Sequence, residues 1–221
     1  LVSYAAFGVF TVRYFPAYSA PYGDEATYYS YAEHPWTLIG EFFEGYRPKE
    51  VMNPYNFRLF LTPFAVVFKL FGFTYVGARL VVFTYGLLML LLTYAVASYM
   101  VRPLWSLAAV ILLSVSPSFL YLTHGVRPEG MMGLFVLLCT WLMIRHPAAV
   151  PSKTYFFVGL ISASTLWIHY NGVIVCLIVF AMLLSYDLRS LSWNKVAAFA
   201  GGGALFAVAF VVLNFLPAWA T

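Results

Sequence analysis

Residues 80–101, LVVFTYGLLMLLLTYAVASYMV, contain no charged side chain. A helix needs about 20 consecutive apolar residues to cross a bilayer, so this stretch predicts a membrane-spanning helix. The rest of the 221-residue chain is similar, because 63% of it is hydrophobic and only 9% is charged. About a quarter of the residues of a soluble protein are charged. We therefore expect an integral membrane protein with room for about seven or eight spans and no large soluble domain.

Seven apolar runs are candidate spans. They are residues 1–12, 80–101, 103–123, 130–144, 154–168, 172–186 and 196–219. An eighth run, 54–71, carries Arg58 and Lys69, and a basic side chain at mid-bilayer costs roughly 2.5–3.5 kcal/mol. We expect it to be an interfacial or re-entrant helix. The predicted fold is all-α: a polytopic transmembrane helix bundle of about seven spans, in which residues 1–221 form one module, 13–78 the outer loop and 79–219 the bundle.

The charged residues predict the orientation of the chain. If 54–71 does not cross the membrane, the short loops at one face carry Arg102, Arg145, Lys153, Arg189 and Lys195, with Asp187 as their acid. An excess of basic residues in short loops is typical of the cytoplasmic side. The remaining acids then lie on the non-cytoplasmic face: Asp24, Glu25, Glu33, Glu41, Glu44, Glu50 and Glu129.

Three polar clusters share that predicted outer face. The first is residues 24–29, DEATYY, the second 124–130, HGVRPEG, and the third 167–172, WIHYNG. Each has a structural alternative. Acids are favourable in the first turn of a helix, an Arg and a Glu at a membrane edge can form an anchor with its counter-ion, and aromatic residues commonly line the interface.

Other function classes are disfavoured by the residues. No charged side chain lies near the middle of the seven runs, which counts against an ion-coupled transporter, because intramembrane charges mark ion pathways. Cys139 and Cys176 lie inside apolar runs, where free cysteine behaves as a small hydrophobic residue. The thinly spread basic residues do not form a nucleic-acid patch.

Carboxylates and cations from separate parts of the chain on one membrane face suit an anionic headgroup on a lipid tail. A lipid-linked phosphosugar would fit. Its leaving group is a phosphate that needs no protonation, so one carboxylate suffices to take the proton of the attacking hydroxyl, with inversion at the anomeric carbon. An Arg or a metal ion would stabilise the phosphate charge. The alternative is a non-catalytic carrier or flippase that binds the same headgroup.

The polar clusters resemble those of a known superfamily. The run Asp24-Glu25-Ala26-Thr27-Tyr28 resembles the acidic motif of the GT-C glycosyltransferases, most closely the protein O-mannosyltransferase and aminoarabinose transferase group. Similar blocks follow in the same order: 53–55 through 70–72, 78–80, 116–121 with 127–129, and 167–172. The resemblance covers essentially the whole chain. Glu129 stands where the family frequently has Asp, and His169 where Lys is common.

This resemblance implies an enzyme whose active site faces away from the cytoplasm and whose donor is a polyprenyl- or dolichyl-phosphate sugar. Asp24 matches the catalytic base, with Glu25 beside it. Donor-phosphate binding is expected from Arg79, Arg127, His169 and Tyr170. Glu129 is a candidate for a divalent metal ion or for an orienting contact.

The same resemblance sets the expected surroundings. The acceptor would be a protein, lipid or glycan, and the membrane a prokaryotic plasma membrane or the endoplasmic reticulum. We expect the 221 residues to be the front part of a longer protein, whose C-terminal portion recognises the acceptor.

Overall fold

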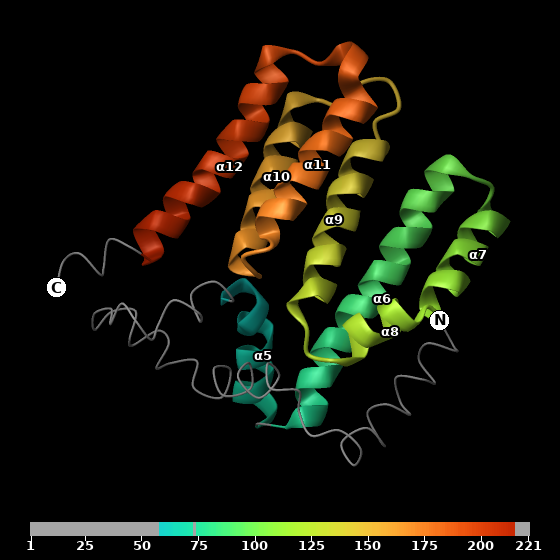
Figure 1. Cartoon of the computed structure of the whole chain (residues 1–221), viewed down its shortest axis with the longest axis vertical. Helices are drawn as coiled ribbons and strands as arrows, with labels where there is room; N and C mark the ends of the chain where they lie inside the picture. Colours follow the sequence, from blue (N-terminus) through green and yellow to red (C-terminus); the bar gives the residue numbers. More distant parts are fainter. Residues whose placement is uncertain (1–57, 73, 215–221) are drawn as a thin grey trace. The chain divides into compact units, whose positions relative to one another are not determined.

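The computed structural model describes residues 58–72 and 74–214, and these residues form helices joined by short turns (Figure 1). The α-helices are α5 (Arg58–Phe71), α6 (Tyr75–Met100), α7 (Pro103–Ser114), α8 (Pro117–His124), α9 (Pro128–Ile144), α10 (Ser152–Ser164), α11 (Gly172–Asp187) and α12 (Trp193–Asn214). Two 3-10 turns, η2 (Thr165–Trp167) and η3 (Leu188–Ser190), lie before and after α11. The described residues divide into two compact units: unit 1 contains 60–72 and 74–134, and unit 2 contains 58–59 and 135–214.

In unit 1, α5 is amphipathic. Phe60, Phe64 and Phe68 are buried along one side of the helix, whereas Leu70 and Phe71 at its end are exposed. Gly72 follows with φ of 79°, a left-handed conformation that glycine adopts readily and that commonly ends a helix. Thr74 then caps α6, because its Oγ1 accepts a hydrogen bond of 3.0 Å from the Gly77 N–H.

The long helix α6 is followed by two short ones. Residues 103–123, expected as one span, form α7 and α8, which meet at a bend of 66°. The bend has a clear cause in Pro117, which has no N–H to donate and which disfavours helical geometry at the residue before it. Ser116 is accordingly extended, with φ of −65° and ψ of 127°.

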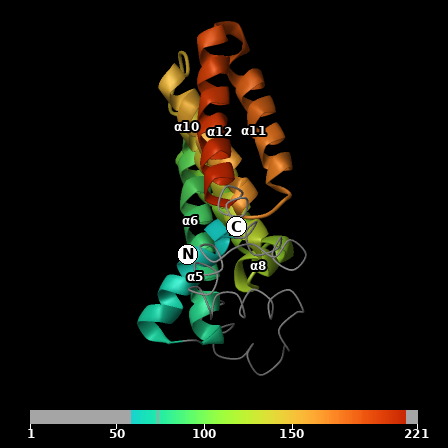
Figure 2. The ribbon, with the colours of Figure 1, turned by 90° about the vertical axis from the view of Figure 1, so that its left-hand side faces the viewer.

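Unit 2 is built on a close pair of helices, α10 and α12. A Cβ at Gly159 would lie 2.1 Å from the Phe199 carbonyl oxygen, and one at Gly202 would lie 2.0 Å from that of Phe156. Only glycine allows the two backbones to approach so closely. α11 completes the unit beside them, as two perpendicular views show (Figures 1 and 2). Its Phe180 lies 5.3 Å from Phe199, centroid to centroid.

The helix after residue 152 ends earlier than expected. Residues 154–168 were predicted as one span, but α10 ends at Ser164 and continues as the 3-10 turn η2. Hydroxyl groups compete for the backbone carbonyls here: Ser164 Oγ donates to Ile161 O over 2.7 Å, and Thr165 Oγ1 donates to Ser162 O over 2.5 Å. Such bonds are a common source of local irregularity in helices.

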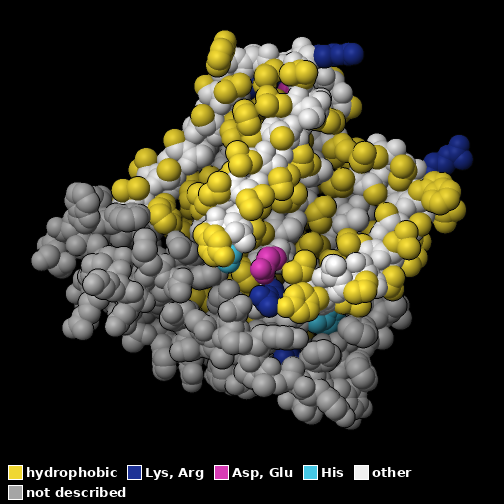
Figure 3. Space-filling model, viewed as in Figure 1, with side chains coloured by type: hydrophobic (Ala, Val, Ile, Leu, Met, Phe, Trp, Pro, Cys, Tyr) yellow, Lys and Arg dark blue, Asp and Glu magenta, His cyan; other side chains and the backbone are white. Residues whose placement is uncertain are grey.

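The expectation of a membrane protein is confirmed at the level of helices. Within residues 58–72 and 74–214, three helices have the length and hydropathy of a span: Val76–Met100, Gly172–Ser190 and Trp193–Val212. The bent pair α7 and α8 would make a fourth if it counts as one broken span. Side chains on the face shown in Figure 3 are mostly hydrophobic where the chain is described.

The predicted number of about seven spans stays a prediction. The run 1–12 lies outside the described residues, and α9 is apolar but shorter than a full span. α5 has 14 residues among those described, about 21 Å at 1.5 Å per residue, against a hydrocarbon core of about 30 Å. The expectation of an interfacial or re-entrant helix at 54–71 stays a prediction, because the described part of the chain begins at Arg58.

Candidate functional site

Arg79 lies in the second turn of α6 and is only 6% exposed. One turn further along, the Phe83 ring lies 6.0 Å from the ring of His124 at the end of α8. The start of α6 therefore lies beside the residues that join α8 to α9. Of the predicted site residues, Arg127 belongs to this segment, and Glu129 follows it as the second residue of α9. Unit 1 thus brings Arg79, Arg127 and Glu129 to one end.

Arg127 is held by a tyrosine of the preceding helix. Its Nη2 donates a hydrogen bond of 2.6 Å to Tyr121 Oη, and its guanidinium carbon lies 5.4 Å from the centre of the same ring. The sequence left open whether Arg127 pairs with Glu129 as an anchor with its counter-ion. The structure shows a contact with Tyr121 instead, which orients a group with five N–H donors.

Glu129 is the second residue of α9, where the helix dipole favours an acid. The start of α9 approaches α8 closely, since a Cβ at Gly130 would lie 2.9 Å from the Leu122 carbonyl oxygen. Glu129 is half-buried, and its Oε2 atom is buried without a hydrogen-bond partner among the described residues. An unsatisfied buried carboxylate oxygen is costly unless a ligand completes it.

A metal ion at Glu129 was an open alternative. Among the described residues, no three His, Cys, Asp or Glu side chains are grouped so that they could hold a metal. Metal binding at Glu129 would therefore take its other ligands from a substrate phosphate or from outside the described residues. Metal dependence stays a prediction.

Tyr85 was not among the sequence-predicted site residues. It lies on α6, is 8% exposed, and its hydroxyl is buried without a hydrogen-bond partner within the described part of the chain. In the sequence it is one aromatic residue among many in an apolar run. No sequence signal distinguished it, because only the fold shows that its hydroxyl is buried.

His169 and Tyr170 lie in unit 2, in the turn that joins η2 to α11. The His169 side chain is 8% exposed, and its Nδ1 accepts a hydrogen bond of 3.1 Å from the Asn171 N–H. This bond requires an unprotonated Nδ1, so His169 can offer a neutral Nε2–H donor rather than a full charge. The exposed Tyr170 ring lies 3.9 Å from the His169 ring, centroid to centroid.

The turn around His169 is tightly built. The His169 N–H donates to the Thr165 carbonyl over 3.0 Å, and the His169 carbonyl accepts from the Gly172 N–H over 2.8 Å. A Cβ at Gly172 would lie 2.4 Å from the Thr165 carbonyl carbon. Glycine at 172 is therefore a packing requirement of this turn.

The opposite end of unit 2 holds a different polar cluster. Asp187 Oδ2 accepts hydrogen bonds from Lys195 Nζ over 2.6 Å and from Tyr155 Oη over 2.9 Å. Ser190 Oγ donates to Asp187 Oδ1 and accepts from Lys195 Nζ over 2.7 Å. This cluster, Tyr155, Asp187, Ser190 and Lys195, is called the Asp187 cluster below. Its groups satisfy one another, which is typical of a structural network.

Basic loops also lie at the Asp187 end of unit 2. Tyr186 Oη donates to the carbonyls of Ile144 and His146 over 3.4 Å, so the turns after α9 and after α11 adjoin. Arg145, Lys153, Arg189 and Lys195 therefore share one end of this unit, and His169 lies at the other end of α10. Within unit 2, this agrees with the predicted alternation of basic and polar turns.

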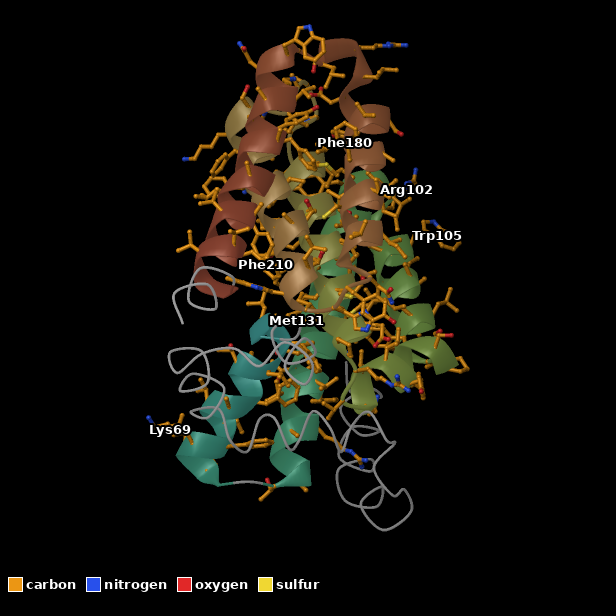
Figure 4. All side chains as sticks on the ribbon, turned by 60° about the vertical axis from the view of Figure 1, so that its left-hand side comes forward. Lys69, Arg102, Trp105, Met131, Phe180 and Phe210 are labelled. Carbon is orange, nitrogen blue, oxygen red and sulfur yellow. The ribbon has the colours of Figure 1, made fainter. Side chains whose placement is uncertain are left out.

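The turn between α6 and α7 carries side chains of a kind typical of a membrane edge. A shallow hollow of about 540 Å³ is lined there by Tyr99, Met100, Val101, Arg102 and Trp105. Arg102 and Trp105 project away from the helices (Figure 4). Exposed aromatic and basic side chains are typical of membrane interfaces. The hollow lies at the far end of α6 from Arg79.

Asp24 and Glu25, the predicted catalytic pair, lie outside the described residues. The structure therefore places five of the predicted site residues: Arg79, Arg127 and Glu129 in unit 1, and His169 and Tyr170 in unit 2. Their proposed roles stay predictions. In unit 1, two arginines and a partly buried carboxylate from two separate stretches of sequence lie at the same end.

Comparison with known proteins identifies the family. The sequence pattern of the dolichyl-phosphate-mannose-protein mannosyltransferases matches residues 61–215. The match includes the five described site residues and begins after Asp24 and Glu25. No curated protein matches the chain, and no solved structure does. The matched range covers well over half of the chain and indicates a membrane glycosyltransferase of the GT-C type, so the chain belongs to the dolichyl-phosphate-mannose-protein mannosyltransferase family.

Proposed function

We propose that this protein is an inverting glycosyltransferase that moves a sugar from a polyprenyl- or dolichyl-phosphate donor to an acceptor hydroxyl on the non-cytoplasmic face of the membrane. The family match carries the proposal, since its name specifies a lipid-phosphate sugar donor. The gathering of Arg79, Arg127 and Glu129 at one end of unit 1 supports it. The acceptor would be a protein, lipid or glycan.

The proposed reaction breaks one bond and forms one. Asp24, supported by Glu25, takes the proton of the acceptor hydroxyl as that oxygen attacks the anomeric carbon. The bond between the anomeric carbon and the phosphate oxygen breaks, and the polyprenyl or dolichyl phosphate leaves with the bonding electrons. No general acid is required, because the phosphate leaves as an anion.

Arg127 and Arg79 are proposed to hold the donor phosphate. A guanidinium is always protonated and can bind phosphate through two parallel hydrogen bonds. Tyr121 fixes the direction of Arg127 through one N–H. His169 and Tyr170 are proposed as neutral contacts to the same donor. A divalent ion at Glu129, if bound there, would supply further positive charge to the phosphate.

The test compares two variants of the full-length protein in membranes supplied with a radiolabelled polyprenyl-phosphate sugar. Asp24→Asn should abolish transfer while donor binding remains, because the amide cannot take a proton. Arg127→Ala should weaken donor binding. A carrier or flippase would instead bind the donor equally well in the wild type and in Asp24→Asn, with no transfer by either, and that result would contradict the proposal.

The proposed membrane face has its own test. Single cysteines would be placed near Arg127, His169 and Arg189 on a background lacking Cys139 and Cys176. An impermeant thiol reagent applied to intact cells should label the first two and spare the third. Labelling near Arg189 but not near Arg127 would invert the proposed orientation.

A further inference from the structure

In unit 1, Tyr85 Oη on α6 and Glu129 Oε2 on α9 are buried oxygen atoms that lack hydrogen-bond partners within the described residues. Tyr85 is more than nine-tenths buried. Such groups are rare in folded proteins, because each loses its bond to water and gains nothing in return. They are rarer still in a membrane segment, where water is scarce.

The packing of α6 and α9 relates these two atoms. Gly133 lies against Met89, since a Cβ at 133 would be 2.8 Å from Met89 Cε. Both helices begin at the same end of unit 1: the start of α6 lies beside His124, and α9 begins four residues after His124. The two helices therefore run in the same direction where they touch.

One helical turn from this contact lie Tyr85 and Glu129. Tyr85 precedes Met89 by four residues, and Glu129 precedes Gly133 by four. Residues four apart share a helix face. Moving one turn toward the Arg79 end on each helix therefore brings Tyr85 and Glu129 to facing sides of the neighbouring helices.

The chemistry of the pair selects a ligand group. A tyrosine hydroxyl donates one hydrogen bond, and an ionised carboxylate oxygen only accepts. A phosphate oxygen could accept from Tyr85 but has no proton for Glu129. A hydroxyl group can accept from Tyr85 and donate to Glu129 at once.

We propose that Tyr85 Oη and Glu129 Oε2 together bind one hydroxyl of the donor's sugar. The assignment rests on the proposed function, because it takes the ligand to be a lipid-phosphate sugar whose phosphate is held by Arg79 and Arg127. Tyr85 thereby becomes a sugar-binding residue. The pair contributes to the preference for the sugar and leaves the lipid phosphate to the arginines.

The test measures the affinity of the full-length protein for two lipids by ligand-dependent thermal shift. One is a polyprenyl-phosphate sugar. Its sugar is mannose, glucose or aminoarabinose, whichever of the three lipids the wild type binds most tightly. The other is polyprenyl phosphate without a sugar. The wild type should prefer the sugar lipid, and Tyr85→Phe should reduce that preference at least five-fold with unchanged affinity for polyprenyl phosphate. The melting temperature of Tyr85→Phe should not fall, because phenylalanine removes an unpartnered hydroxyl.

A matched control lies on the same helix. Thr93 Oγ1 is also buried without a partner among the described residues, but it lies two turns beyond Tyr85, away from Arg79. Thr93→Val should leave both affinities unchanged. Glu129→Gln gives a second route to the answer if Tyr85→Phe does not fold, and it should lower the same preference.

Two results would overturn the inference: a wild type that binds both lipids equally, or a Tyr85→Phe variant that keeps the wild-type preference. The proposed function is decided separately by sugar transfer. A wild type that transfers sugar but binds the two lipids equally would remove the role of Tyr85 and leave the proposed function standing. A wild type that binds the sugar lipid more tightly but transfers no sugar would contradict the proposed function and leave the sugar-binding role of Tyr85 standing.

Discussion

The polar ends of the two units differ in how their groups are satisfied. In the Asp187 cluster of unit 2, carboxylate, ammonium and hydroxyl groups bond to one another. In unit 1, Tyr85 and Glu129 each keep a buried oxygen without a partner among the described residues. A polar group that its neighbours complete stabilises the fold, whereas one that they leave incomplete is available to a ligand. This contrast separates a structural cluster from a candidate site.

The largest expected effect tests the framework of unit 2. Gly202→Val should prevent folding or lower the free energy of unfolding by more than about 4 kcal/mol. Its Cβ would lie 2.0 Å from the Phe156 carbonyl oxygen, which is closer than two non-bonded atoms can approach. Gly203→Ala is the control, since a Cβ at 203 would lie an ordinary 4.0 Å from Ala163 Cβ. Yield and thermal unfolding in detergent measure both. Equal stability of the two variants would show that α10 and α12 do not pack as described.

The Asp187 cluster should matter for stability alone. Asp187→Ala leaves Lys195 buried without its carboxylate and should cost about 3 kcal/mol, near the lower end for buried ion pairs because the cluster lies at the ends of its helices. Thermal unfolding measures the loss. The double variant Asp187→Leu with Lys195→Met should recover part of it, because it removes both charges together. A double variant no better than Asp187→Ala would show that the pair is not the source of the effect.

Arg127→Lys tests the proposed phosphate-binding role of the polar end of unit 1. Lysine keeps the charge but loses the planar fork that binds phosphate through two bonds. We expect the affinity for polyprenyl phosphate to fall about ten-fold, equal to about 1.4 kcal/mol, with an unchanged melting temperature. Arg145→Lys, at the other polar end, should leave the affinity unaltered. Equal losses in both variants would indicate a non-specific effect of charge.

Tyr121→Phe should have the smallest effect. Phenylalanine keeps the ring near the Arg127 guanidinium but removes the oxygen that accepts from Nη2. Because Tyr121 is about half exposed, water can replace this bond, and we expect KM for the donor to rise about three-fold with little change in kcat. Tyr99→Phe, an exposed tyrosine at the far end of α6, is the control. A fall in kcat at constant KM would place Tyr121 in the chemical step instead.

Much of the fold follows from apolar runs and prolines. The run 80–101 predicts α6 to within a few residues, and the run 172–186 predicts α11 almost to its ends. Pro117 indicates that residues 103–123 divide into two helices, but the uniform hydrophobicity of this run led to the prediction of a single span. The end of α10 at Ser164 depends on which backbone carbonyls accept hydrogen bonds from the hydroxyls of Ser164 and Thr165. These partners depend on the packing of the folded protein and cannot be predicted from the sequence pattern.

The candidate site was predictable only in part. Arg127 and Glu129 are conspicuous because charges are scarce in this chain, whereas Arg79 became a candidate only through the family resemblance. The partner of Arg127 was not predictable: the helical bend at Pro117 and the turn at 125–127 together bring Tyr121 to it. Tyr85 gave no signal, because burial of a hydroxyl is a property of the folded state.

The comparison between the two polar ends is tested most directly by measuring stability and donor affinity for Arg127→Ala and Asp187→Ala in the same full-length protein. Arg127→Ala should keep the melting temperature and lose most of the affinity for polyprenyl phosphate. Asp187→Ala should lower the melting temperature and keep the affinity of the folded molecules. If Asp187→Ala instead abolishes donor binding by folded protein while Arg127→Ala leaves it intact, the functional end has been assigned to the wrong unit.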